Sequence, residues 1–183
     1  MAGSRCRLAA DRRYPPPVTD RRIVQRGLYF EEFDLDALYV HSPGRTVTET
    51  DNVLFTTLTM NTQSLHLDAQ WAESTEFGER LVNSMFTLST LVGTSVSQLT
   101  QGTIVANLGF REVRFPYPMR HGDTMSSSTR VLSKRLSASR PGQGIVEFEH
   151  TARNQHDQVV ATAVRSTLML CRPDTLPSLG DRG

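Results

Sequence analysis

The sequence has no long apolar run, very little cysteine and no excess of charge of either sign. No stretch approaches the roughly 18 to 20 apolar residues that a membrane-spanning helix needs, so we expect no membrane span. Twenty basic and nineteen acidic side chains give a net charge of +1, which indicates neither a nucleic acid nor an acidic membrane surface as a partner. The two cysteines, Cys6 and Cys171, lie near opposite ends. They predict no disulfide framework and suit the reducing cytoplasm.

Several short motifs of known chemistry are missing as well. The sequence contains no Gly-rich nucleotide loop, no Gly-x-Ser-x-Gly elbow and no pair of cysteines two residues apart, which excludes P-loop enzymes, α/β-hydrolases and zinc enzymes with those signatures. His41, His150 and His156 lack the spacing of metal ligands. We therefore expect no metal site and no bound cofactor.

At 183 residues, with 38% hydrophobic and 21% charged side chains, the chain has the composition of one folded domain. Residues 1–22 carry six arginines around three consecutive prolines and lack the apolar segment of a secretory signal. This pattern predicts a disordered extension at 1–22. We expect the folded domain at 23–173 and a flexible tail at 174–183.

Three helical segments are expected in the first half of the chain. The first begins after Thr48 or Thr50, either of which can serve as its N-cap. A second, shorter helix starts at Asp68. The longest covers 83–99, where apolar residues alternate with small Ser and Thr side chains, as expected of a central helix that is packed on most sides. The apolar side of the first helix is formed by Val53, Leu54, Phe55 and Leu58.

The second half of the chain has the pattern of long strands separated by turns. The expected strands are 104–115, 124–139, 144–154 and 159–171. A helical half followed by an antiparallel run predicts an α+β fold in which the sheet curls round the central helix. In the first half, we expect Ser42-Pro43-Gly44 to form a turn before a short strand at 46–48. In the third long strand, side chains alternate between two faces, with Val146, Phe148 and His150 on one face and Ile145, Glu147 and Glu149 on the other. This alternation predicts one packed face and one polar face.

The segment from Thr59 to His66 reads Thr-Met-Asn-Thr-Gln-Ser-Leu-His and is the most informative in the chain. It resembles the hydratase motif of the MaoC-like, R-specific enoyl-CoA hydratases, whose pattern is Ser-Gly-Asp-x-Asn-Pro-x-His. The resemblance extends over about 22–171 and implies a single hot-dog fold, in which a curved antiparallel sheet wraps a long central helix. The histidine of the motif is His66. The aspartate of the motif is replaced by Asn61, which cannot act as a carboxylate base.

The resemblance also implies a chemical role for these residues. His66 would act as general acid and base on water and an enoyl-CoA thioester, and Asn61 would orient the water or the thioester. The family's His-Gly-Met corresponds to Asn83-Ser84-Met85, so Ser84 N–H at a helix N-terminus would polarise the thioester carbonyl. We expect substrate contacts from Gln63 and from 83–85.

Arg140, in the turn before the third long strand, could bind the phosphates of coenzyme A. A solvated hairpin tip is an equally good interpretation of the same residue. Asp51 and Asp68 are possible replacement bases, but helix capping explains both better. His121-Gly122-Asp123 is interpreted as a turn that leads into a strand.

The sequence therefore predicts a hydratase or dehydratase that adds water to, or removes it from, the double bond of an enoyl-CoA. A substrate that carries its own carboxylate, such as mesaconyl-CoA or itaconyl-CoA, could compensate for the missing aspartate. The alternatives are a non-catalytic thioester-binding protein and a hot-dog thioesterase. Coenzyme A would arrive as part of the substrate, the location would be cytoplasmic, and the resemblance implies a homodimer or higher homo-oligomer without nucleic-acid or membrane partners.

Overall fold

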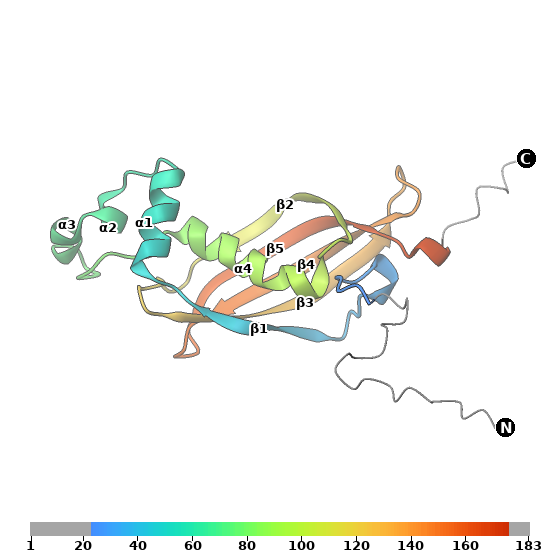
Figure 1. The fold of residues 1–183 in the computed structure, drawn as a ribbon, viewed down its shortest axis with the longest axis horizontal. Helices are drawn as coiled ribbons and strands as arrows, with labels where there is room; N and C mark the ends of the chain where they lie inside the picture. Colours follow the sequence, from blue (N-terminus) through green and yellow to red (C-terminus); the bar gives the residue numbers. More distant parts are fainter. Residues whose placement is uncertain (1–22, 176–183) are drawn as a thin grey trace, which may run out of the picture.

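The computed structural model describes residues 23–175, so the expected extension 1–22 and most of the expected tail 174–183 lie outside the described residues. The helices and strands are labelled in Figure 1. The strands are β1 (Leu38–Thr46), β2 (Ile104–Arg114), β3 (Thr124–Leu136), β4 (Gln143–Arg153) and β5 (Val159–Leu170). The helices are α1 (Glu49–Leu58), α2 (Ser64–Leu67), α3 (Ala69–Glu73) and α4 (Ser84–Leu99), with 3-10 turns η1 (Phe30–Glu32) and η2 (Pro173–Thr175).

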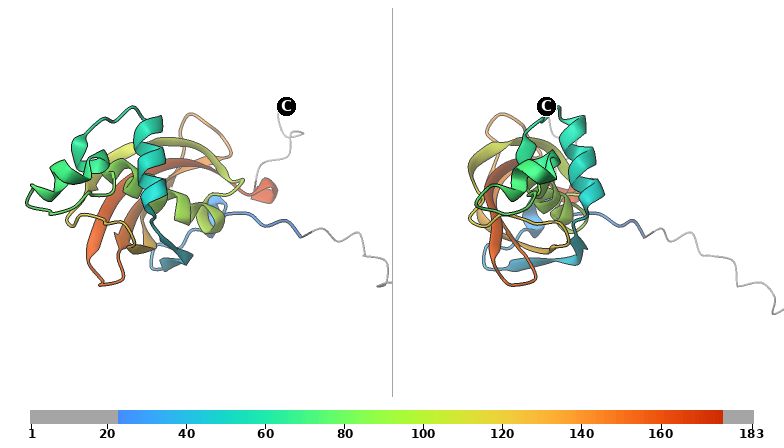
Figure 2. Two further views of the ribbon diagram at one scale, coloured as in Figure 1. Left: turned by 60° about the vertical axis from the view of Figure 1, so that its left-hand side comes forward. Right: turned by 90° about the vertical axis from the view of Figure 1, so that its left-hand side faces the viewer.

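Five antiparallel strands form one sheet in the order β1-β3-β4-β5-β2. The consecutive strands β3, β4 and β5 occupy the centre, and β1 and β2, which flank the helices in the sequence, form the two edges. Helix α4 lies lengthwise across the sheet in Figure 1, and the end-on view in Figure 2 shows the sheet curling around it. The predicted α+β hot-dog architecture is confirmed.

The burial of β4 follows the predicted alternation. Every second side chain of this strand is buried, including Val146, Phe148 and His150, and the side chains between them are partly exposed. Because successive side chains of a strand point to opposite faces, one face of β4 packs into the interior. Helix α4 anchors both parts of that interior, since Leu91 belongs to one cluster of buried apolar residues and Leu99 to the other. Truncating either leucine to alanine would destabilise the fold by about 2–5 kcal/mol.

The first strand differs from the prediction. Ser42-Pro43-Gly44 is not a turn before a strand at 46–48; it lies inside β1, where the pairing with β3 shifts register between His41 and Arg45. Proline is tolerated here because β1 is an edge strand with a bulge, so a missing backbone N–H breaks no regular ladder. The local turn signal was overridden by pairing with β3.

Helix α1 begins at the predicted cap but buries a different side. Thr48 accepts a hydrogen bond from Asp51 N, and Asp51 bonds back to Thr48 N, which makes a reciprocal capping box. The fully buried residues of the helix are the polar Asn52 and Thr56, whereas Leu54 is 56% exposed. The apolar side identified from spacing is therefore not the buried side.

A chain of hydrogen bonds, here called the polar row, crosses the sheet beneath α4. His41 Nδ1 lies 2.7 Å from Gln98 Oε1, and His41 Nε2 lies 2.7 Å from Thr129 Oγ1. Thr129 Oγ1 also lies 2.7 Å from His150 Nδ1. Because Gln98 Oε1 can only accept, His41 carries its proton on Nδ1, Thr129 donates to His41, and His150 donates to Thr129. This order leaves His150 Nε2 as an acceptor.

The polar row ends at His150, and Arg165 lies close enough to act on the charge of that histidine. Within the described residues, neither His150 Nε2 nor Arg165 Nη1 has a hydrogen-bond partner, although both are buried. Arg165 Nε donates to Asn107 Oδ1 at 3.1 Å, and burial lowers the pKa of Arg165. Burial also lowers the pKa of His150 to about 3, so this histidine is neutral at neutral pH.

Over residues 23–175, no helix combines the length and hydropathy needed to cross a membrane.

Candidate active site

The loop after α1 sets the position of His66. Met60 adopts a positive φ of 56°, and Asn61 then turns the chain because its Oδ1 accepts from Gln63 N at 3.1 Å. This side-chain turn starts α2 at the next residue, Ser64, and His66 N closes the first helical turn onto Gln63 O at 3.0 Å. The motif segment is therefore a side-chain turn at Asn61 followed by the short helix α2, and Asn61 holds the entry to that helix.

The ring of His66 is half-buried and has a defined orientation. His66 Nδ1 lies 3.0 Å from the Leu81 carbonyl oxygen. A carbonyl oxygen only accepts hydrogen bonds, so Nδ1 carries the proton and Nε2 keeps its lone pair. His66 lines a cavity of about 470 Å³. The imidazole thus offers a proton acceptor to whatever fills that cavity.

Helix α4 begins at the same cavity. Asn83 is its N-cap and accepts from Met85 N at 2.9 Å. Ser84 lines the cavity, and within the described residues no partner is found for its backbone N–H. The first N–H groups of a helix have no intrahelical acceptor and carry the positive end of the helix dipole. Ser84 N–H is thus available to an anionic or carbonyl oxygen.

The rest of the cavity wall is mostly apolar and comes from five parts of the chain. They are α2, the segment between α3 and α4, helix α4, the segment between β2 and β3, and the start of β5. Besides His66 and Ser84, the lining consists of Leu65, Phe77, Leu81, Val82, Thr87, Phe115, Pro116, Tyr117, Pro118, Met119 and Val160. An apolar chamber with a few polar groups is typical of a site for an acyl group.

Asn52 connects the His66 segment with the start of α4. Its side chain is 0% exposed. Asn52 Oδ1 accepts from Asn83 N at 2.8 Å. Its Nδ2 lies 3.2 Å from His66 O and 3.3 Å from Leu81 O. The sequence offered no signal for it, because Asn52 is one of several polar residues in this helix.

His121 also reaches this group. Asn52 Nδ2 lies 3.0 Å from His121 Nε2. Burial, followed by the nearby Arg80 charge, lowers the pKa of His121. The predicted turn at His121-Gly122-Asp123 is confirmed, because Gly122 has a φ of +89° and Asp123 Oδ2 accepts from Arg120 N. The histidine of that turn nevertheless contacts the buried side of the candidate site.

The other carboxylates considered from the sequence have structural partners. Asp51 belongs to the capping box of α1 and pairs with Arg45 at 2.5 Å. Asp68 caps α3 by accepting from Trp71 N at 3.0 Å. The capping interpretation is confirmed for both. Within residues 23–175, no group of three His, Cys, Asp or Glu side chains is arranged to hold a metal ion.

The predicted substrate contacts separate into two groups. Ser84 lines the cavity with His66. Asn83 is 2% exposed and bonds at both ends of its side chain, to Met85 N and Thr56 Oγ1, so it acts as a cap. Gln63 and Met85 are exposed and are not part of the cavity lining.

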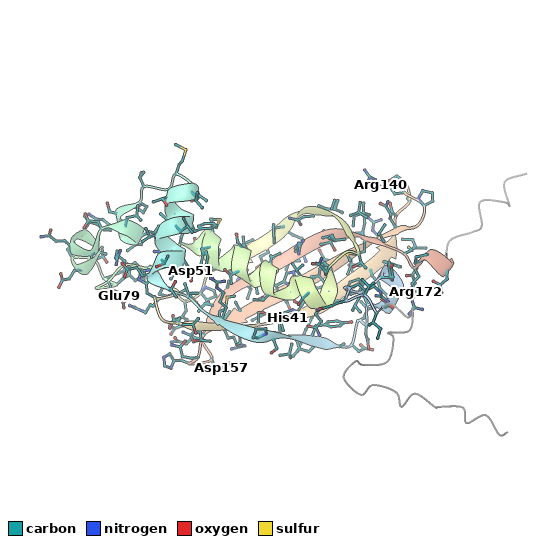
Figure 3. The ribbon with its side chains drawn as sticks, viewed as in Figure 1. His41, Asp51, Glu79, Arg140, Asp157 and Arg172 are labelled. Carbon is teal, nitrogen blue, oxygen red and sulfur yellow. The ribbon has the colours of Figure 1, made fainter. Side chains whose placement is uncertain are left out.

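Arg140 lies far from His66 within one chain. It sits in the β3–β4 turn at one end of the molecule, whereas α1, α2 and α3 lie at the opposite end (Figures 1 and 3).

Known proteins resemble this chain in both sequence and fold. The family model described as MaoC like domain matches residues 33–165. The beta-methylmalyl-CoA dehydratase of Chloroflexus aurantiacus is 29% identical over 153 residues, which cover 83% of this chain and 43% of that protein. The mesaconyl-CoA hydratase of Haloarcula marismortui is 28% identical over 159 residues, covering 87% of this chain and 44% of that protein.

Among solved structures, the putative MaoC domain protein dehydratase from Chloroflexus aurantiacus matches with a TM-score of 0.78 and 27% identity, over 86% of this chain and 44% of that one. The present chain therefore spans less than half the length of these relatives.

Proposed function

Because the chain belongs to the family of MaoC-like domains, we propose that it is an acyl-CoA hydratase or dehydratase. One observation carries the proposal. The ring of His66, with a free Nε2, and the unpaired N–H of Ser84 line the same largely apolar cavity. A proton acceptor and a preorganised hydrogen-bond donor are what the addition of water to an enoyl thioester requires.

In the hydration direction, the thioester carbonyl accepts a hydrogen bond from Ser84 N–H. His66 Nε2 removes a proton from water while the water oxygen bonds to Cβ of the enoyl group. The electron pair of the double bond moves towards the thioester oxygen, where Ser84 N–H stabilises the developing negative charge. The proton then passes from His66 to Cα, which restores the neutral ring, and dehydration follows the reverse path. The Leu81 carbonyl stabilises the imidazolium through Nδ1–H.

Asn61 is not among the residues that line the cavity within one chain, and we propose a role in orientation for it from the edge of the site. Its Oδ1 is engaged by Gln63 N, so the amide Nδ2 is the end that can contact a ligand. An amide N–H donates to water, to a carbonyl or to a carboxylate, but it cannot accept the proton that an aspartate would. His66 is then the principal acid and base, with Asn61 holding the water or the substrate.

We propose a carboxylated enoyl-CoA, such as mesaconyl-CoA or itaconyl-CoA, as the substrate. A neutral amide at position 61 tolerates a substrate carboxylate, whereas an aspartate there would repel it. Two of the relatives are named for beta-methylmalyl-CoA and mesaconyl-CoA. The substrate carboxylate could also assist the proton transfer that the missing aspartate would have served.

We further propose that the chain works as a homodimer or higher homo-oligomer in the cytoplasm. Leu54, Leu58 and Met85 are about half exposed or more, on α1 and at the start of α4, and burying such apolar surface favours association. A second copy could also bring Arg140 towards the phosphates of coenzyme A. A strictly monomeric species with full activity in sedimentation would contradict this assembly.

A panel of acyl-CoA thioesters followed by mass spectrometry tests the reaction class. Gain or loss of 18 mass units, the mass of one water, on mesaconyl-CoA, itaconyl-CoA or a straight-chain enoyl-CoA supports the proposal. Release of free coenzyme A would identify a thioesterase instead. Retained binding without any change in mass would identify a non-catalytic thioester-binding protein, for which the absence of a carboxylate at position 61 is the favouring observation.

A further inference from the structure

We infer that Asn52 is a positioning residue that fixes His66 and the N-terminus of α4 relative to each other, with His121 as its outer anchor. The inference rests on the proposed function, because it assigns Asn52 a part in that reaction. Asn52 does not line the cavity, so it acts through the groups that do.

The contacts of Asn52 join both halves of the site through one rigid amide. Its Oδ1 accepts from Asn83 N, the residue directly before Ser84, at 2.8 Å. Its Nδ2 lies within hydrogen-bond distance of the His66 carbonyl and the Leu81 carbonyl. The amide plane is short and has no internal flexibility, so a shift of either half is passed to the other.

The Leu81 carbonyl is the shared element of this arrangement. It accepts from His66 Nδ1 at 3.0 Å and from Asn52 Nδ2 at 3.3 Å. Leu81 N in turn donates to Leu65 O at 3.1 Å. Because Asn52 holds the carbonyl from a second direction, the direction of Nδ1–H is fixed, and with it the direction of Nε2 into the cavity.

His121 completes the orientation of the Asn52 amide. Asn83 N–H requires an oxygen at one end of the amide, and the two carbonyls require the nitrogen at the other. The atom facing His121 is therefore the donor Nδ2, so His121 Nε2 must be an acceptor with its proton on Nδ1.

The stability of the fold does not by itself require a polar residue at position 52. A fully buried asparagine costs desolvation that an apolar residue of the same size would avoid, and only its hydrogen bonds offset that cost. A buried, fully satisfied polar group specifies one arrangement of its neighbours more strictly than apolar packing does. At this position the neighbours are the proposed acid/base and the proposed carbonyl donor.

The test compares Asn52→Leu, which keeps the branching and the number of side-chain heavy atoms and removes every side-chain hydrogen bond, with Thr129→Val. Thr129 is also fully buried and loses two hydrogen bonds in that variant, but it lies in the polar row beneath α4. With mesaconyl-CoA and crotonyl-CoA as substrates, we expect Asn52→Leu to lower kcat by about 10²-fold with little change in KM, as for small misplacements of reacting groups. Thr129→Val should lower the Tm and leave kcat unchanged. Equal losses of kcat in both variants would reduce Asn52 to a stability role.

A second pair of variants tests the anchor. In His121→Gln the side-chain oxygen can still accept from Asn52 Nδ2, whereas in His121→Leu nothing can. We expect the glutamine variant to keep near wild-type kcat and the leucine variant to lose about tenfold, the equivalent of one hydrogen bond. If both variants behave alike, His121 has no part in positioning.

A measurement without substrate separates this inference from the proposed function. Nitrogen-15 NMR of labelled histidines reports the tautomer of each ring, and we expect wild-type His66 to carry its proton on Nδ1 alone. Asn52→Leu should give a mixture of tautomers at His66, and Thr129→Val should not. If the wild type turns over no thioester, the proposed function fails and the tautomer result still decides the inference. An unchanged His66 tautomer in Asn52→Leu overturns it.

Discussion

Polar side chains are buried in two regions of the molecule, around Asn52 and in the polar row. The two regions differ in whether the buried polar atoms have hydrogen-bond partners. Around Asn52, both ends of the amide are occupied and every contact leads to the candidate site. In the polar row and beside it, His150 Nε2 and Arg165 Nη1 are left without partners within the described residues. Satisfied buried groups fix a geometry, and unsatisfied ones cost stability. We therefore expect the first region to control activity and the second to control stability and its dependence on pH.

The largest expected effect falls on activity at the first region. His66→Ala should lower kcat by about two to four orders of magnitude, the usual loss on removing a general acid or base. The Tm should change little, because within the described residues the half-buried ring makes one hydrogen bond, to the Leu81 backbone carbonyl. Steady-state kinetics on the active thioester, together with thermal melts, measure both. His156→Ala, in the exposed β4–β5 turn, is the matched control, and an unchanged rate in His66→Ala would remove His66 from the mechanism.

The second effect falls on stability in the polar row. The pKa of folded His150 is lowered by burial to about 3, whereas an unfolded histidine titrates near about 6.5. Between these values the unfolded state binds the extra proton. The free energy of unfolding should therefore fall as the pH drops from about 6.5 towards 3, by up to about 1.4 kcal/mol per pH unit for this group.

Denaturant unfolding at pH 7, 6 and 5 measures this slope, and His150→Gln should reduce it to the part that His41 and His121 contribute, since burial lowers the pKa of both. The upper part of the range is the informative one. Below about pH 4.5 Glu32 also contributes, because its pKa is lowered to about 2, chiefly by the hydrogen bond from Arg26, and its protonation destabilises the fold too. Equal slopes in the two proteins would show that His150 is not the group responsible.

The third prediction compares Thr129, whose hydroxyl is hydrogen-bonded within the polar row, with Arg165 beside that row, whose Nη1 has no partner within the described residues. Thr129→Val breaks two buried hydrogen bonds and should cost about 1–3 kcal/mol of stability. Arg165→Met removes a buried charge that has no carboxylate partner within the described residues, and it should be neutral or stabilising. Denaturation midpoints at pH 7 compare the two. A large loss in Arg165→Met would mean that its guanidinium has a partner in the folded protein.

The smallest effect is expected from Asn61→Asp, at the edge of the first region. The new carboxylate should lower activity on mesaconyl-CoA several-fold, because like charges near 4 Å repel by about 1 kcal/mol even in water. Activity on crotonyl-CoA should rise or remain absent. The ratio of the two kcat/KM values is the measurement. Equal turnover of mesaconyl-CoA by both proteins would instead make Asn61 a residue of the turn alone.

The sequence predicted those elements that are determined by residues close together in the chain. The cap at Thr48, the central helix and the alternation along β4 all depend on residues a few positions apart. The importance of Asn52 could not be predicted in this way. Its partners are 14, 31 and 69 positions away, at His66, Asn83 and His121. Spacing rules also missed the most buried side of α1, because Asn52 and Thr56 face polar backbone and cap atoms, although Phe55 of the predicted side does pack against Phe86 of α4.

The bulge and Pro43 in β1 bear on how the protein avoids aggregation. An exposed edge strand offers its free backbone groups to any other chain that can extend the sheet. In β1 the register shifts between His41 and Arg45, and Pro43 supplies no N–H within that interval. A foreign strand could form only a short, interrupted ladder here. The same residues that broke the local turn rule therefore make this edge a poor template for fibre growth.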